Sequence, residues 1–300
     1  MNVRLLSVPY DSGHRAARLG RGPDAFLAGG LPEHLARAGH TVGRTTIELD
    51  GGFGAEVGAA FALNRRLASA VRGAAARGET SLVLTGNCVS CVGTLAGVGP
   101  EDVGVLWFDA HADFNTPDTS TSGFLDGMAV AIATGECWRA AARTVPHFQA
   151  VPVERVVLVG ARAFDPGERE RFERAGGTVV GPDDVGHEGE SETVRATLAA
   201  LRERTGRLYV HIDLDVLDPA EGRANPFAEP GGLTRGQVRG ILVHAVQQFV
   251  VAAAALSAYD PAEDADGRIL RAGIELSAAL FEGISAPAPP PQPSRPPRKC

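Results

Sequence analysis

The chain has 300 residues, of which 44% are hydrophobic and 22% charged, and this composition excludes a mainly disordered protein. The length suits one large α/β domain or two small ones. The formal net charge of −7 argues against the broad basic surface of a nucleic-acid-binding protein.

Strand-like apolar runs alternate with helix-like stretches along most of the chain. The first expected strand is Val3–Val8, followed by a helix that opens at Gly22-Pro23-Asp24 and a long helix over Glu56–Arg77. Further strands are expected at Ser81–Leu84, Val103–Phe108, Arg155–Val159, Leu208–Ile212 and Val250–Leu256, with helices at Glu168–Arg174, Glu192–Arg204 and Arg235–Val246. Most of these strands are continuous apolar runs, which predicts one mostly parallel sheet with helices on both faces.

The C-terminal residues 285–300 have a different composition, because they contain seven of the 20 prolines. Such a segment cannot form a helix or a central strand. We therefore expect a folded domain over residues 1–284 and an extended or disordered tail over 285–300. A ligand for a proline-binding module and an arm that contacts another subunit are the alternatives for this tail.

The cysteines and the apolar runs indicate the compartment. No run approaches the roughly 18 apolar residues of a membrane span, and the N-terminus lacks the apolar segment of a signal peptide. We expect a cytoplasmic protein with neither membrane nor nucleic-acid partners, whose four cysteines are free thiols. Cys88 and Cys91 have C-x-x-C spacing, but a zinc site would need a second ligand pair of matched spacing.

Two of the expected strands end in dense acidic clusters, Asp109-x-His111-x-Asp113 and Asp213-x-Asp215. Functional side chains of an open parallel sheet gather at the carboxyl ends of its strands, and alternate residues of an extended chain point to one side. Four carboxylates and one imidazole repel unless cations neutralise them, and this mixed set suits Mn²⁺, Fe²⁺ or Zn²⁺. The clusters predict a two-metal hydrolase centre, against the alternative that the aspartates only cap strand-end turns.

These motifs, together with the segment 19–24, resemble the ureohydrolase family of arginases, agmatinases and formiminoglutamases over nearly all of residues 3–283. The resemblance implies a three-layer α/β/α fold with a roughly eight-stranded sheet, two Mn²⁺ ions per subunit, and a trimer or hexamer. It also implies that a metal-bridging hydroxide attacks a guanidinium carbon, with Asp113 helping to carry the proton to the leaving nitrogen. Carried over by motif, the metal ligands are Asp109, His111, Asp113, Asp213 and Asp215.

The loop after Asp113 resembles the arginase branch, which acts on an amino acid. The resemblance implies that Asn115, Ser120 and Ser122 bind the α-carboxylate of the substrate and that Asp165 faces its α-ammonium group. Neutral amide and hydroxyl donors suit a carboxylate, and an acid suits an amine. The expected partner is therefore a small guanidino amino acid.

Three positions depart from the family pattern. Cys88 replaces a histidine metal ligand, Asp126 a proton-shuttling histidine, and Ala258 a guanidinium-binding glutamate. Cys88 could ligate a metal, act as a catalytic thiol, or be inert. Asp126 could assist proton transfer, although a carboxyl group of ordinary pKa is a weak acid at pH 7. Unless Asp260 or Glu263 substitutes, the guanidinium group lacks a charged partner.

A less basic substrate needs that charged partner less, and the hydroxyl of an N-hydroxyguanidine lowers its basicity. The departures therefore favour hydrolysis of Nω-hydroxy-L-arginine to L-ornithine and hydroxyurea. They resemble the branch of the family that makes hydroxyurea for D-cycloserine biosynthesis. An arginase or another guanidino-acid hydrolase is the alternative enzyme, and a catalytically silent binding or regulatory protein of the same fold is the alternative from another class.

Overall fold

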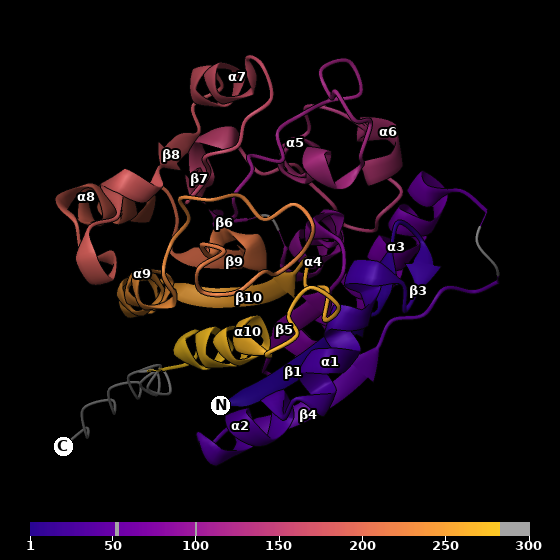
Figure 1. Cartoon of the computed structure of the whole chain (residues 1–300). Coiled ribbons are helices and arrows are strands. Elements are labelled where there is room, and N and C mark those ends of the chain that lie inside the picture. The colour runs from indigo at the N-terminus through magenta and orange to yellow at the C-terminus, as the bar shows by residue number, and fades with distance from the viewer. Residues whose placement is uncertain (52–53, 100, 283–300) are drawn as a thin grey trace, which may run out of the picture.

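The structure is a computed structural model that describes residues 1–51, 54–99 and 101–282, and the expected tail 285–300 lies outside these ranges. Its centre is a sheet of eight strands in which every neighbouring pair is parallel (Figure 1). In sheet order the strands are β4 (Thr41–Thr46), β1 (Asn2–Val8), β5 (Glu79–Thr85), β10 (Val250–Ser257), β9 (Arg207–Asp213), β6 (Val103–Phe108), β7 (Val156–Val159) and β8 (Thr178–Val180).

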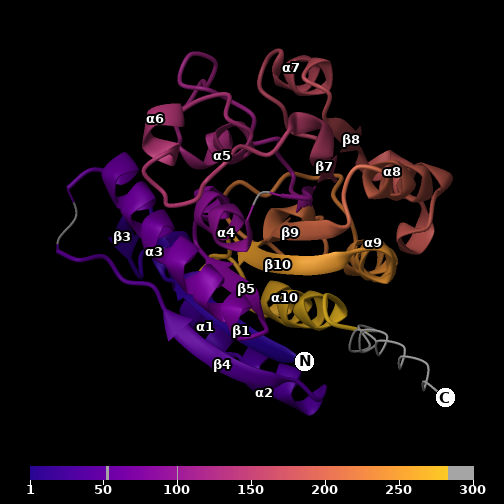
Figure 2. The same cartoon turned by 180° about the vertical axis from the view of Figure 1, so that it is seen from behind.

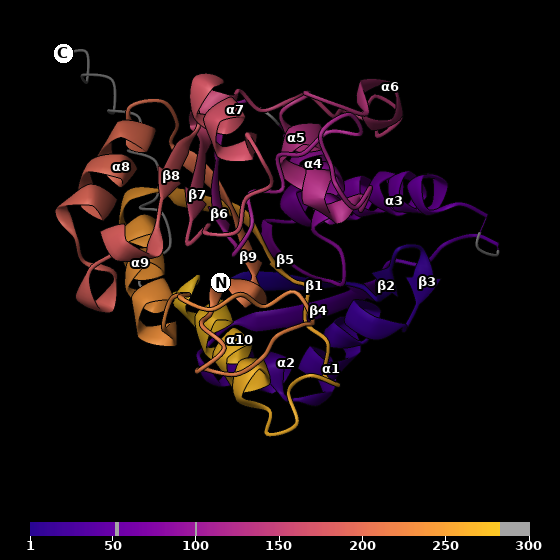
Figure 3. The ribbon, with the colours of Figure 1, turned by 45° about the horizontal axis from the view of Figure 1, so that its top comes forward.

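Two helical layers cover the sheet, so the predicted three-layer α/β/α fold is confirmed. One face packs against α1 (Gly22–Ala28), α2 (Leu31–Arg37), α8 (Glu192–Arg202), α9 (Arg235–Gln248) and α10 (Arg268–Ala279). The other face packs against α3 (Glu56–Ala76), α4 (Cys91–Val98), α5 (Ala129–Ala133), α6 (Arg139–Ala142) and α7 (Glu168–Arg174). Figure 2 shows α3 lying along β5 and β1, and Figure 3 shows the sheet between α8 and α9 on one side and α4 and α5 on the other.

The apolar runs explain which strands the sequence reveals. All six expected strands are present, and β6 is buried at every residue, as a strand covered on both faces requires. The two strands of this sheet that we did not predict, β4 and β8, are its edges, and a separate hairpin of β2 (Tyr10–Asp11) and β3 (His14–Arg15) was not predicted either. Most of β4 is polar and exposed, and β8 has only three residues, so neither contains the apolar run that identifies a central strand.

Because all eight strands are parallel, their carboxyl ends meet at one edge of the sheet. Cys88 opens the short helical turn η2 (Cys88–Ser90) just after β5, and Asp109 follows β6 directly. Asp213 and Ser257 are the last residues of β9 and β10. Four neighbouring strands therefore deliver their terminal side chains to the same place, as expected of an open α/β sheet.

Two further expectations concern thiols and membranes. Cys88, Cys91 and Cys137 are buried free thiols, as predicted. Among the helices of the described ranges, none is long and apolar enough to cross a lipid bilayer.

Candidate active site

A cavity of about 590 Å³ opens at the carboxyl edge of the sheet. Asp109 does not line it and is buried beside it, with 1% of its surface exposed. The other predicted site residues all line the cavity: Cys88, His111, Asp113, Asn115, Ser120, Ser122, Asp126, Asp165, Asp213 and Asp215. Residues that are far apart in the sequence thus share one space large enough for an amino-acid substrate.

Two groups of side chains in this region could each hold a metal ion. The first comprises Cys88, Asp109 and Asp213, and the second comprises Asp109, His111 and Asp215. Within each group the ligand atoms lie within 4.8 Å of one another. Because Asp109 belongs to both groups, the arrangement suits two cations that share one carboxylate.

Asp113 provides an independent test of whether a cation fits here. This residue has a positive φ of 51°, which is unusual for a residue other than glycine. Its side chain is 7% exposed, and its Oδ2 atom has no hydrogen-bond partner. A buried carboxylate oxygen without a partner is costly unless a cation approaches it. The orphaned oxygen and the mixed O, N and S donors around it therefore fit a divalent metal centre.

Hydrogen bonds fix the orientation of the clustered carboxylates. Asp109 accepts hydrogen bonds from Trp107 Nε1 at 2.9 Å and from the backbone N–H of His111 at 2.7 Å. Asp213 accepts one from the backbone N–H of Asp215 at 3.0 Å. Asp215 in turn accepts one from the backbone N–H of Ala110 at 3.1 Å. The acidic groups are thus held in place by backbone and indole donors before any metal binds.

Burial and mutual repulsion dominate the electrostatics of this cluster. Burial and then the neighbouring carboxylates raise the pKa of Asp113 and of Asp213 well above the usual range. Burial, reinforced by Asp109, raises the pKa of Asp215 to about 6. For His111, burial lowers the pKa, but hydrogen bonding to Asp109 and the charges nearby outweigh it and raise the value to about 9. Bound protons or cations would relieve this repulsion.

The raised pKa of Asp215 gives a testable effect on stability. Between about pH 4, where an unfolded aspartate ionises, and about pH 6, the folded wild type holds a proton that the unfolded chain has released. The metal-free protein therefore loses stability as the pH rises through this window. In the presence of a chelator, we expect the Tm of Asp215→Asn minus that of the wild type to increase from pH 4 to pH 6. A Tm difference that does not change with pH would contradict this expectation, and added Mn²⁺ should favour the wild type.

Cys88 is held at the base of the cavity. Its Sγ donates a hydrogen bond to Asp213 Oδ2 at 3.1 Å. Gly86 allows the segment before Cys88 to pack closely against Tyr10, because a Cβ atom at this position would overlap the carbonyl oxygen of Tyr10. Burial and the surrounding carboxylates raise the pKa of the Cys88 thiol well above its usual range, so a free thiolate nucleophile is disfavoured. A bound cation would lower this pKa, so the position of Cys88 is compatible with ligation of a metal.

Asp126 is held in place by hydrogen bonds from the residues on either side of Cys88. Its carboxylate accepts hydrogen bonds from the backbone N–H of Val89 at 3.1 Å and from Asn87 Nδ2 at 2.5 Å. Burial raises its pKa to about 7, so this carboxyl group is still partly protonated at neutral pH, whereas one of ordinary pKa is almost fully ionised. Asp126 can therefore hold a proton near neutral pH beside the cavity.

The predicted substrate loop is ordered by contacts with the segment before α7. Asn115 Nδ2 donates a hydrogen bond to Asp165 Oδ2 at 2.9 Å, and Ser120 Oγ lies 3.5 Å from Ser122 Oγ. The buried Glu168 joins the two segments, because it accepts hydrogen bonds from the backbone N–H groups of Phe114 at 2.9 Å and of Asp165 at 3.0 Å. One end of the cavity thus presents hydroxyl and amide groups next to a carboxylate.

The chain is similar in sequence and in fold to known proteins. A sequence model of the Arginase family matches residues 1–282. The chain belongs to the arginase family.

This arginase-family chain is 29% identical to the arginase of Bacillus caldovelox, over 93% of this chain and 97% of that protein. It is 32% identical to the Nω-hydroxy-L-arginine amidinohydrolase of Streptomyces lavendulae, over 87% and 91%. The crystal structure of arginase from Bacillus cereus matches with a TM-score of 0.85 and 27% identity, over 94% and 99%. This arginase-family chain is therefore a hydrolase that acts on amidino groups.

In this arginase-family chain, the segment after β10 brings no acidic side chain to the cavity. Ala258 lines the cavity, with a positive φ of 56°. Asp260 instead pairs with Arg21 at 2.8 Å, and Glu263 pairs with Arg223 at 3.2 Å. Neither acid lines the cavity, so the structure brings neither of them to the site where the family resemblance implies a guanidinium-binding glutamate.

The loop after β9 adds cavity residues that the sequence did not reveal. Arg162 donates hydrogen bonds to the backbone carbonyls of Asp215 at 3.0 Å and Glu229 at 2.7 Å, which ties this loop to the sheet. Glu229 lines the cavity, and so does Phe227, whose ring centroid lies 5.8 Å from that of Phe124. The only sequence signal for these residues is their position after an acidic strand end.

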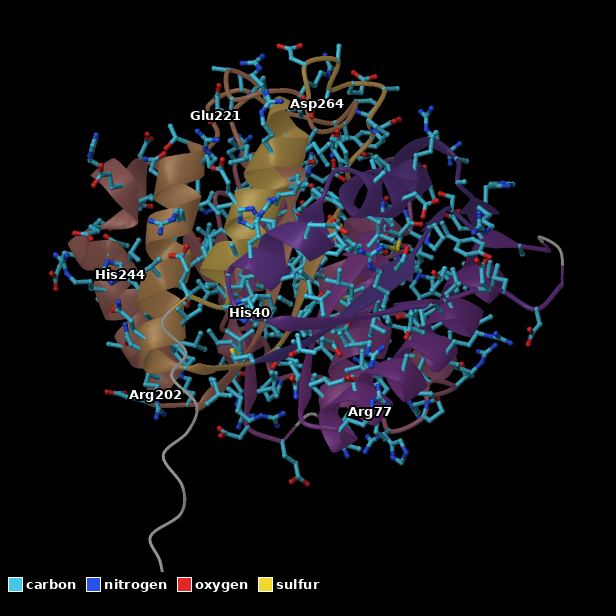
Figure 4. All side chains as sticks on the ribbon, turned by 90° about the horizontal axis from the view of Figure 1, so that it is seen from below. His40, Arg77, Arg202, Glu221, His244 and Asp264 are labelled. Atoms are coloured by element: carbon cyan, nitrogen blue, oxygen red, sulfur yellow. The ribbon has the colours of Figure 1, made fainter. Side chains whose placement is uncertain are left out.

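The loops after β9 and β10 support each other at this edge. Arg268 Nη1 donates a hydrogen bond to the carbonyl of Ala220 at 2.9 Å. Figure 4 labels Glu221 and Asp264, one from each loop, at the same end of the molecule. The hydrogen bond from Arg268, the first residue of α10, therefore supports the loop after β9.

Proposed function

We propose that this chain hydrolyses Nω-hydroxy-L-arginine to L-ornithine and hydroxyurea, with two Mn²⁺ ions per subunit. One observation carries the substrate choice: Ala258 lines the cavity where arginases have the glutamate that binds a guanidinium ion, and the acids that follow are paired elsewhere. Losing a buried charge partner costs most for a fully charged guanidinium and least for a weakly basic N-hydroxyguanidine. The similarity to an enzyme named for this substrate supports the same proposal.

Cys88, Asp109 and Asp213 would hold one ion, and Asp109, His111 and Asp215 would hold the other. Asp113 would contribute the oxygen that has no partner in the protein. When bound, the two cations lower the pKa of water and so supply a nucleophile at neutral pH. Trp107 and the backbone donors keep the acidic side chains in place for this role.

The remaining side chains bind the substrate and move protons. Asn115, Ser120 and Ser122 donate hydrogen bonds to the α-carboxylate, and Asp165 accepts one from the α-ammonium group. With this end fixed, the guanidino carbon extends toward the acidic cluster. Water adds to that carbon and the bond to the ornithine nitrogen breaks. Asp113 carries the proton from water to the leaving nitrogen, and Asp126 can hold a proton nearby.

The decisive experiment compares kcat/KM for Nω-hydroxy-L-arginine and L-arginine, with metal analysis of the same sample. We expect about two Mn²⁺ per chain, a preference for the hydroxylated substrate, and hydroxyurea as product. A preference for arginine would show that the chain is an arginase, which the acidic Glu229 in the cavity favours. A sample that binds at most one weak ion and turns over neither substrate would indicate a silent binding protein.

Asp165 offers a test of the amino-acid end of the cavity. We expect Asp165→Ala to raise KM about tenfold or more with a smaller effect on kcat, because a charge-assisted hydrogen bond contributes about 1.5–3 kcal/mol to binding in both ground and transition states. The measurement is repeated with the substrate analogue that lacks the α-amino group. That analogue should bind wild type and variant equally, and an equal loss for both compounds would argue against the assigned contact.

The variant Cys88→Ser distinguishes a metal ligand from a catalytic thiol at this position. Loss of both activity and metal supports ligation, whereas loss of activity with both ions retained supports a catalytic thiol.

We further propose that the chain is a homo-oligomer, a trimer or hexamer, which light scattering coupled to size exclusion tests directly. Its product would serve D-cycloserine biosynthesis, in a cytoplasmic pathway that consumes hydroxyurea.

A further inference from the structure

Behind Cys88 lies a chain of buried hydrogen bonds that the proposed reaction does not use. Ser257 Oγ lies 3.3 Å from Cys88 Sγ and 2.8 Å from His211 Nε2. The other ring nitrogen, His211 Nδ1, lies 2.7 Å from the hydroxyl of Tyr209. All four side chains are at most 2% exposed. Water therefore cannot replace any of these contacts.

The imidazole of His211 is held rigidly. Its ring stacks on the indole of Trp107 with centroids 3.6 Å apart and planes 6° from parallel. The same indole donates its N–H to Asp109, the carboxylate common to both candidate metal groups. His211 thus has one fixed orientation, and its Nε2 points at Ser257.

Both ring nitrogens of His211 have a hydroxyl partner, and the tautomer of the imidazole decides which of them donates. In the tautomer with the ring hydrogen on Nε2, the hydroxyl of Tyr209 donates to Nδ1 and Nε2 donates to Ser257 Oγ. The hydrogen of Ser257 is then free for another acceptor. The two within reach are Cys88 Sγ at 3.3 Å and the carbonyl of Ile212 at 3.4 Å.

We propose that Ser257, oriented by His211, donates a hydrogen bond to Cys88 Sγ and holds this sulfur toward the metal centre. Both are positioning residues, because neither lines the cavity and both act through Cys88. In the metal-free protein the thiol gives its own hydrogen to Asp213, which leaves the sulfur as an acceptor for Ser257. Once the sulfur is a thiolate, it becomes a stronger acceptor than the carbonyl of Ile212.

This inference rests on the proposed function, since it requires Cys88 to ligate a metal ion. Partners that orient a ligand from behind typically change metal affinity by about 10–100-fold when they are removed. The probe is Co²⁺, which gives a thiolate-to-metal absorption band when a cysteine binds it. The metal-free full-length protein is titrated with Co²⁺, and both the affinity and the band are measured.

We expect Ser257→Ala to weaken Co²⁺ binding about tenfold and to shift the thiolate band without removing it. His211→Phe, which keeps the stack on Trp107 but removes the donor, should change both quantities in the same direction. His211→Gln, which restores an N–H donor, should come closer to the wild type. The matched control is Ser277→Ala, because Ser277 is equally buried but donates to the carbonyl of Gly273 within α10.

The outcomes separate this inference from the proposed function. If the wild type binds Co²⁺ without a thiolate band, Cys88 is not a ligand, and both its proposed ligation and the positioning role of Ser257 are overturned, while the substrate preference is tested separately by kcat/KM. If the wild type shows the band, Cys88→Ser loses it, and Ser257→Ala matches the wild type in affinity and band, only the positioning role is overturned. Circular dichroism and thermal unfolding establish whether each variant is folded. If Ser257→Ala is not folded, the two His211 variants test the positioning role.

Discussion

Replacing Asp109 with asparagine is expected to lower kcat/KM by about a thousandfold or more. Asp109 is the one residue that belongs to both groups of candidate metal ligands, so one substitution weakens both. Bound metals contribute several kcal/mol to such a reaction, and each 1.4 kcal/mol or so is a factor of ten in rate. Steady-state kinetics and metal analysis of the purified variant measure the two losses together.

Asp118→Asn is the matched control for this variant. Asp118 is exposed, lies on the loop that follows the same strand, and does not line the cavity. The Asp118→Asn substitution removes the same negative charge, and it should leave both the activity and the metal content unchanged. An Asp109→Asn protein that kept both ions and more than about a tenth of its activity would show that the shared carboxylate is not essential.

The second large effect is expected from Ala258→Glu, which restores the acidic side chain that arginases have there. We expect the ratio of kcat/KM for L-arginine to that for Nω-hydroxy-L-arginine to rise about tenfold or more, because a partly desolvated charge pair contributes about 2 kcal/mol or more. The backbone already holds a side chain at a φ of 56°, so the longer residue adds little conformational strain. The ratio is measured by competition of the two substrates in one reaction.

Ala262→Glu adds the same charge outside the cavity. Ala262 is exposed and lies four residues further along the same segment. This control should leave the substrate ratio unchanged, which distinguishes a specific contact from a general change of field. If Ala258→Glu also left the ratio unchanged, the missing glutamate would not explain the choice of substrate.

Much of the fold could be predicted from sequence because its central strands are covered on both faces. The run Val103–Phe108 is apolar at nearly every position, and the structure gives β6 the same bounds. The edge strand β4 could not be found in this way, since its threonines face solvent on one side. Its pairing with β1 depends on contacts between chain segments that the local sequence does not contain.

The candidate site was predictable where short motifs follow a strand directly. Asp109 and Asp213 lie at strand ends, so the parallel sheet alone brings them together. Glu229 and Asn225 reach the cavity by a different route, because the path of a long loop decides their position. That path is set by contacts such as those of Arg162, which donates hydrogen bonds to carbonyls from three separate segments. Local sequence carries no signal for such contacts.

The place of β10 in the sheet has a consequence for how the protein acquires its metals. β10 is the last strand among the described residues, and it lies between β5 and β9, so it separates the strand that precedes Cys88 from the strand that ends at Asp213. Without β10 the sheet would consist of two halves with open edges. The group Cys88, Asp109 and Asp213 takes its members from both halves, so we expect it to form only after β10 has joined them. The ions would then be taken up by an assembled sheet rather than serving as a template for it.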